Sequence, residues 1–187
     1  MRRVDPRPLL GEPLPLDLLN THWIERGELQ DLLETVDGVA IWLASSSIPA
    51  AERPAAGEEL RLRLCETREA IQAVAEHPAS VDARSAFNAI LARGHRRRRL
   101  AEAPQPGAGG RSLSTVVAEP GWEVPWTIAD TYLDLLDRSA DRIRRCQHPE
   151  CVLWYLDTSK SGNRRWCSMS ICGNRAKAAR HYRRQAD

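Results

Sequence analysis

The chain has 187 residues, of which 42% are hydrophobic, and a formal net charge of +2. This length suits one domain of ordinary size with a small appended module, and the apolar content suffices for a core, which excludes wholesale disorder. No apolar run of about 18 residues occurs, which excludes a membrane-spanning helix. The basic start of the chain is not followed by the apolar stretch of a signal peptide. We therefore expect a cytoplasmic protein with no membrane partner.

The small net charge conceals an acidic part and a basic part. Residues 142–187 contain 11 Lys and Arg against 3 acidic residues, a formal +8, whereas residues 1–141 contain 16 against 22, a formal −6. The division predicts two domains, 1–141 and 142–187, with different roles. The alternative is that the basic charge only keeps a small module soluble.

The sequence of the first half of the chain predicts short helices or strands, followed by two longer helices. Residues 16–21 suit a short strand or the first turn of a helix, and residues 28–33 and 37–46 are predicted to be short helices. Residues 57–76 form the clearest helix, because apolar residues recur at intervals of three and four. A further helix is predicted over residues 80–93, with Ser80 as its N-cap.

A β-hairpin and a connecting helix are predicted next. The hairpin has strands near residues 96–102 and 112–118, joined by a segment rich in turn residues. A helix over residues 125–145 then leads into the C-terminal part, with Pro125 near its first turn. The fold class is therefore α+β: a mostly helical N-terminal domain with a small hairpin, followed by a small C-terminal module.

Two cysteine pairs dominate the C-terminal module. Four residues separate Cys146 from Cys151, four separate Cys167 from Cys172, and fifteen lie between the pairs. This spacing brings four thiolates to one centre, and four thiolates leave no open position for a water molecule. We predict one structural zinc ion. Disulfide bonds are the alternative, but nothing indicates an oxidising compartment.

The rest of the module is expected to form a hairpin and a basic helix. Strands are predicted at residues 152–156 and 164–166, and a helix at 174–185. A zinc knuckle, which is a short loop that carries two cysteine ligands, together with a hairpin and a helix around one zinc ion makes a treble-clef or zinc-ribbon-like finger. Asn174 and Arg175 are expected to brace the zinc knuckle. The predicted nucleic-acid-binding residues are basic side chains of the hairpin and of the outer helix face: Arg164, Arg165, Lys177, Arg180, His181, Arg183 and Arg184.

Several runs of residues resemble a known family. The sequences at 153–159, at 164–169 and above all at Cys172-Gly173-Asn174-Arg175 closely resemble the CGNR zinc-finger family. Residues 16–21 and 40–43 resemble the start of the ABATE domain, which precedes the finger in that family. The resemblance implies a bacterial, stress-induced transcription regulator.

We therefore interpret the chain as a zinc-dependent, DNA-binding transcription regulator. Its finger is expected to bind duplex DNA, and its N-terminal domain to sense a signal or form a homodimer. One alternative is an RNA-binding or ribosome-associated factor, in which Trp154, Tyr155 or Trp166 stacks on bases. Another is a zinc-stabilised protein-interaction module.

An enzyme is not expected, because the zinc site is closed and no nucleophile–base pair can be assembled from the scattered histidines. The candidates for a small-molecule pocket in the N-terminal domain are Asn20, Thr21, His22 and Trp42. The alternative for Asn20 and Thr21 is that they satisfy nearby backbone groups.

Overall fold

The computed structural model describes residues 4–101 and 110–178. Its α-helices are α1 (Leu14–Leu19), α2 (Val36–Ser45), α3 (Glu58–Glu76), α4 (Val81–Leu91) and α5 (Glu123–Ser139), and residues 174–178 are helical as well. Its strands form three antiparallel pairs, β1 (His22–Glu25) with β2 (Glu28–Asp31), β3 (Gly94–Ala101) with β4 (Gly110–Val117), and β5 (Ile143–Arg145) with β6 (Trp154–Leu156). The short turns are 3-10 helices at Leu32–Glu34, Ala50–Glu52 and Ala140–Arg142, and a π-helical turn at Met169–Gly173.

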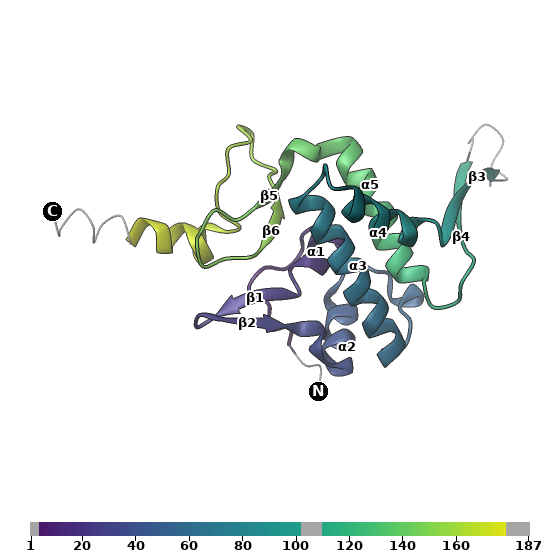
Figure 1. Ribbon diagram of the computed structural model, residues 1–187, viewed down its shortest axis with the longest axis horizontal. Helices are drawn as coiled ribbons and strands as arrows, with labels where there is room; N and C mark the ends of the chain where they lie inside the picture. Colours follow the sequence, from purple (N-terminus) through teal and green to yellow (C-terminus); the bar gives the residue numbers. More distant parts are fainter. Residues whose placement is uncertain (1–3, 102–109, 179–187) are drawn as a thin grey trace.

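The helices occupy the middle of the molecule, between the finger and the β3–β4 hairpin (Figure 1). The finger, residues 142–178 of the described chain, lies at one end, and the hairpin projects at the other. This mixed α+β architecture confirms the predicted fold class. No helix in the described part of the chain is long and apolar enough to cross a membrane.

The helices predicted at residues 57–76 and 80–93 are confirmed as α3 and α4. In α3, Leu60, Leu64 and Ile71 lie on one buried stripe, as the spacing of apolar residues requires. At the start of α4, the Ser80 hydroxyl accepts a hydrogen bond from the Ala83 amide at 3.3 Å, so Ser80 is the N-cap. The predicted hairpin is also present as β3 and β4. For residues 16–21 the sequence allows a short strand or the first turn of a helix, and the structure contains helix α1 there.

The helix predicted at residues 28–33 is wrong. Glu28–Asp31 is strand β2, which pairs with β1 in a register that sets Glu25 opposite Glu28. The turn between them contains Arg26 at a φ of 53° and Gly27 at a φ of 87°. Two successive residues with positive φ make the tight turn that matches the twist of a hairpin. Gly27 is the local signal for this turn, because glycine adopts a positive φ without steric cost.

The elements that enter the finger also differ from the prediction. The connecting helix ends at Ser139, and the chain then forms a 3-10 turn and strand β5. Strand β6 pairs with β5 rather than with residues 164–166, which are not a strand. The pairing continues at both ends, where the Cys146 amide donates to the Leu153 carbonyl at 2.9 Å and the Asp157 amide to the Arg142 carbonyl at 2.8 Å. The first cysteine pair therefore lies in the loop of the β5–β6 hairpin.

The two predicted domains share one hydrophobic core. Buried residues form a continuous cluster that includes Leu16 and Ile71 of the N-terminal domain and Tyr155 of the finger, each with no exposed side-chain surface. Helix α1 makes the connection, because it contacts α3, α5 and β6. Figure 1 shows α1 between β6 and α3. The finger is thus held at a defined position on the N-terminal domain.

Candidate metal centre and basic finger surface

The four cysteine sulfur atoms of the finger lie within 4.8 Å of one another. The Sγ atoms of Cys167 and Cys172 are 3.7 Å apart, and those of Cys151 and Cys167 are 3.9 Å apart. A regular tetrahedron with Zn–S bonds of about 2.3 Å has edges of about 3.8 Å. The four side chains are also buried. Their geometry and donor type fit a closed, structural zinc site.

Local backbone geometry positions each cysteine pair. In the first pair, the Cys151 amide donates to the His148 carbonyl at 3.0 Å, which closes the turn between the two ligands. In the second pair, Ser168 begins the π-helical turn: its hydroxyl accepts from the Ser170 amide, and its carbonyl accepts from the Cys172 amide at 3.1 Å. The Cys167 amide also donates to the Cys146 sulfur at 3.4 Å. Both loops therefore point their thiols inward.

The thiols affect one another's ionisation. Hydrogen bonds from the Cys151 and Cys167 thiols lower the pKa of Cys146 to about 2. Hydrogen bonding to Cys146 raises the pKa of both Cys151 and Cys167, and burial raises the pKa of Cys172 to about 12. One thiolate is thus stabilised at the cost of the other three thiols. A divalent cation supplies the positive charge that lets all four ionise, so zinc binding releases protons.

Arg164 braces the second cysteine pair from the side. Its guanidinium donates to the Trp166 carbonyl at 2.9 Å and to the Cys167 carbonyl, and it stacks on the Tyr155 ring with its central carbon 4.3 Å from the ring centroid. The Arg164 carbonyl in turn accepts from the Tyr155 hydroxyl at 2.5 Å. Side chains that orient the segment carrying metal ligands tune the site without touching the metal.

Two family models match the chain. The CGNR zinc finger matches residues 142–185, and ABATE, described as "Putative stress-induced transcription regulator", matches residues 12–138. The second match covers well over half of the chain. The chain belongs to the ABATE family. A comparison with curated proteins gives no match. In this ABATE protein the four cysteines, located in the CGNR finger, hold one structural zinc ion.

The predicted nucleic-acid-binding residues lie in different environments. Arg165 and Lys177 are exposed on the finger, and Arg165 donates to the Gln147 amide oxygen at 2.7 Å. Arg164 is half-buried and engaged in the bracing contacts. The remaining predicted residues lie outside the described part of the chain: Arg180, His181, Arg183 and Arg184.

Asn174 and Arg175 are exposed, and their side chains make no hydrogen bond or ion pair with any residue that the structure describes. The backbone N–H of Asn174 instead donates to the Met169 carbonyl, which closes the π-helical turn. The sequence predicts that this pair braces the zinc knuckle through its side chains. In the structure, that contact is made by the side chain of Arg164.

The four pocket candidates of this ABATE protein are engaged in internal contacts. Trp42 donates to Asp17 at 2.9 Å, and the Thr21 hydroxyl donates to the Leu18 carbonyl. His22 lies 3.1 Å from Asp31. Asn20 is fully buried and binds the backbone of the finger.

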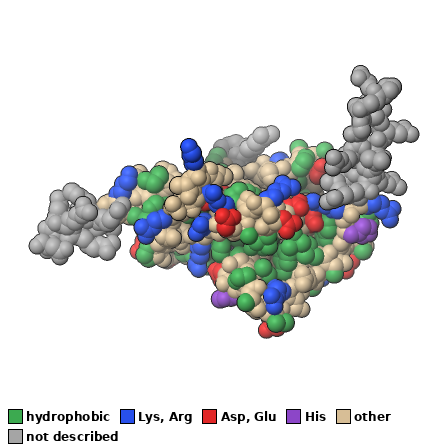
Figure 2. All heavy atoms as spheres, turned by 90° about the horizontal axis from the view of Figure 1, so that it is seen from above, with side chains coloured by type: hydrophobic (Ala, Val, Ile, Leu, Met, Phe, Trp, Pro, Cys, Tyr) green, Lys and Arg blue, Asp and Glu red, His purple; other side chains and the backbone are tan. Residues whose placement is uncertain are grey.

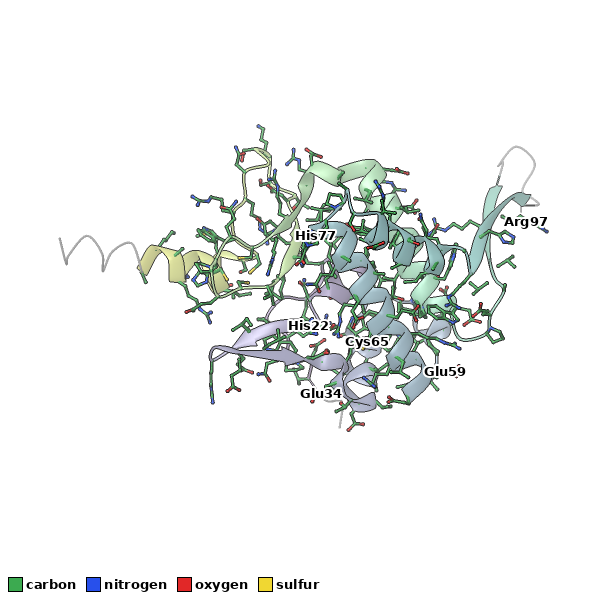
Figure 3. All side chains as sticks on the ribbon, viewed as in Figure 1. His22, Glu34, Glu59, Cys65, His77 and Arg97 are labelled. Carbon is green, nitrogen blue, oxygen red and sulfur yellow. The ribbon has the colours of Figure 1, made fainter. Side chains whose placement is uncertain are left out.

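Thr21 and His22 belong to a charged cluster beneath the β1–β2 hairpin. The Arg68 guanidinium donates to Thr21 at 2.8 Å and forms an ion pair with Asp31. It also lies 3.8 Å from the Cys65 sulfur. Figure 3 labels His22, on β1, and Cys65, on α3. Burial opposes ionisation of Asp31, but hydrogen bonds from His22 and Arg68 hold the pKa of Asp31 well below its ordinary value. The cluster fixes the hairpin on α3.

Two residues that position the finger were not identified from the sequence. The buried Asp157 carboxylate accepts hydrogen bonds from the Ser159 amide at 2.9 Å and from the Arg164 amide at 2.9 Å. The bond to Ser159 is an Asx turn, in which an Asp side chain accepts from the backbone amide two residues later, and this pattern can be read from the sequence. Glu12 accepts from the Leu156 amide at 2.9 Å. No local pattern indicates Glu12, because its partner is 144 residues away in the sequence.

Proposed function

We propose that this ABATE protein is a transcription regulator whose finger binds duplex DNA and whose N-terminal domain senses a signal. One observation carries the DNA-binding part. Among the described finger residues 142–178, the exposed charged side chains are Glu150 and six basic ones: Arg144, Arg145, Lys160, Arg165, Arg175 and Lys177. The other acidic residue in that range, Asp157, is buried.

The basic side chains are disposed for contact with phosphates. Figure 2 shows Lys and Arg side chains on the finger half of one face of the molecule. Lys160, Arg175 and Lys177 make no hydrogen bond or ion pair with any described residue, so their charges are available to an external partner. Phosphate contacts of this kind supply affinity and fix the orientation of a protein on nucleic acid.

The RNA-binding alternative has less support. It depends on aromatic side chains that stack on unpaired bases. Trp154 is 7% exposed and Tyr155 is fully buried, so both serve the shared core. Trp166 is partly exposed, with the Arg165 guanidinium 5.3 Å from its ring centroid.

The test is a salt series of binding to duplex DNA, single-stranded DNA and structured RNA. Wild-type protein is compared with an Arg165→Ala/Lys177→Ala double variant and a charge-matched Arg84→Ala/Arg138→Ala control on the N-terminal domain. For duplex DNA the log–log salt slope is expected to be about −3 or steeper, and the finger variant should reduce it by about 1.8, since each lost phosphate contact removes about 0.9. The control should leave the slope unchanged.

Two outcomes of this test discriminate between the candidate functions. A preference for single strands or RNA loops selects the RNA-binding alternative. Binding to no nucleic acid at low salt refutes nucleic-acid recognition and favours a protein-interaction module. Sedimentation of the protein at its DNA-binding concentration tests the expected homodimer.

A further inference from the structure

A cavity of about 650 Å³ opens where α1, the segment after α2, the end of β4 and the start of α5 meet. Its volume lies within the range of about 300–1,000 Å³ that is typical of small-molecule sites. Most of the wall is apolar and comes from residues of all four segments: Pro13, Leu14, Ile48, Pro49, Val117 and Val124. A ligand that fills this cavity must therefore have an apolar body.

The polar groups of the cavity define the complementary charge. Glu52 and Glu123 line it, together with the hydroxyl residues Ser47, Thr127 and Thr131, and no Lys, Arg or His is among the lining residues whose side chains the structure describes. The carboxylates of Glu52 and Glu123 make no hydrogen bond or ion pair with any residue in the described part of the chain. Two unpaired carboxylates beside apolar walls favour a cation and disfavour an anion.

A neighbouring cavity of about 380 Å³ shares Glu52, Glu123 and Val124 with the first. It also contains Arg63, but this guanidinium is already occupied, because it pairs with Glu59 and donates to the Pro120 carbonyl at 2.7 Å. The shared carboxylates therefore remain available to a ligand from both sides.

The cavity adjoins the segment that holds the finger. Pro13 and Leu14, in its wall, lie at the start of α1, which is only six residues long. Glu12 precedes them and accepts the hydrogen bond from the Leu156 amide of β6. At the other end of α1, Asn20 makes its two hydrogen bonds with the backbone of Trp154. The two residues that contact β6 thus flank α1, and a ligand in the cavity would touch the start of α1.

We infer that this cavity binds a small organic cation with an apolar body, and that α1 transmits its occupancy to the finger. The inference deepens the proposed function, since it names the site and the ligand class of the sensing domain. It does not require the finger to bind DNA, and its test is made without nucleic acid.

The probes are 1-naphthylmethylammonium and 1-naphthylacetate, which share an apolar ring system and differ in the sign of their charge. Binding to the zinc-loaded protein is measured by calorimetry. The ammonium is expected to bind at least about tenfold more tightly than the carboxylate. A Glu52→Gln/Glu123→Gln variant should weaken ammonium binding about fivefold or more, because two exposed charge contacts are lost.

Two further variants make the result specific to the cavity. A Glu28→Gln/Glu69→Gln control removes two exposed carboxylates elsewhere on the N-terminal domain and should leave the affinity unchanged. Thr127→Phe fills the cavity and should abolish ammonium binding. Equal affinity for the two probes, no binding of the ammonium, or unchanged affinity in the Glu52→Gln/Glu123→Gln variant would overturn the ligand assignment.

The coupling to the finger is read by hydrogen exchange. Saturation with the ammonium should change the exchange rates of the Trp154 and Leu156 amides, which donate to Asn20 and Glu12. Rates that are the same with and without the ligand would overturn the coupling through α1. Loss of DNA binding alone would not affect either result, so failure of this inference and failure of the proposed function are distinguishable.

Discussion

The hydrogen bonds between Asn20 and strand β6 predict a large effect of one substitution. The Asn20 side-chain amide donates to the Trp154 carbonyl at 2.9 Å, and its oxygen accepts from the Trp154 amide at 2.8 Å. The carboxamide thereby pairs with the outer edge of β6 as a neighbouring strand would. Asn20 itself is fully buried. In Asn20→Ala, both backbone groups of Trp154 lose their partner within the core.

The magnitude follows from those two groups. Each buried donor or acceptor left without a partner costs about 1–3 kcal/mol. We expect Asn20→Ala to lower the free energy of unfolding by about 2–6 kcal/mol, because two such groups are affected. For a chain of this size each kcal/mol lowers the Tm by about 2–4 °C. The contact between the finger and the N-terminal domain should weaken most.

The assay is urea unfolding of the zinc-loaded protein, together with hydrogen exchange of the Trp154 amide. The matched control is Asn88→Ala, which changes an exposed asparagine of α4 and should alter stability by no more than about 0.5 kcal/mol. A loss for Asn20→Ala as small as that of the control would refute the reasoning, as would continued protection of the Trp154 amide from exchange.

Three further predictions concern the zinc site and the charged cluster. Arg164→Ala should lower zinc affinity about 10–100-fold in a chelator competition, because the braced carbonyls of the second cysteine pair are released, whereas Arg165→Ala should not change it. Cys167→Ser should abolish stoichiometric zinc binding and unfold the finger, measured by metal analysis and circular dichroism. Asp31 has a pKa lowered from its ordinary 3.8, so its contribution to stability is present above that pH and is lost as the pH falls through the folded-state pKa. The stability of Asp31→Asn should therefore depend less on pH below about pH 5 than that of the wild type, and parallel acid profiles would contradict this.

The sequence alone determined the features that depend on local spacing. The two cysteine pairs, the amphipathic stripe of α3 and the Ser80 cap are each defined by residues close together in the chain, so their geometry follows from composition and period. The division of charge at residue 142 likewise separates the basic finger from the acidic N-terminal domain. These patterns were enough to predict the zinc ligands and the α+β fold class.

Tertiary structure decided which residues meet across long distances in the chain. Asn20 and Glu12 contact β6 from positions 134 and 144 residues away, and no local pattern indicates either partner. The choice of β5 as the partner of β6, and of Arg164 as the brace of the second cysteine pair, also depends on packing. Short strands and single arginines have several compatible partners in the sequence, and the packing of the folded chain selects one of them.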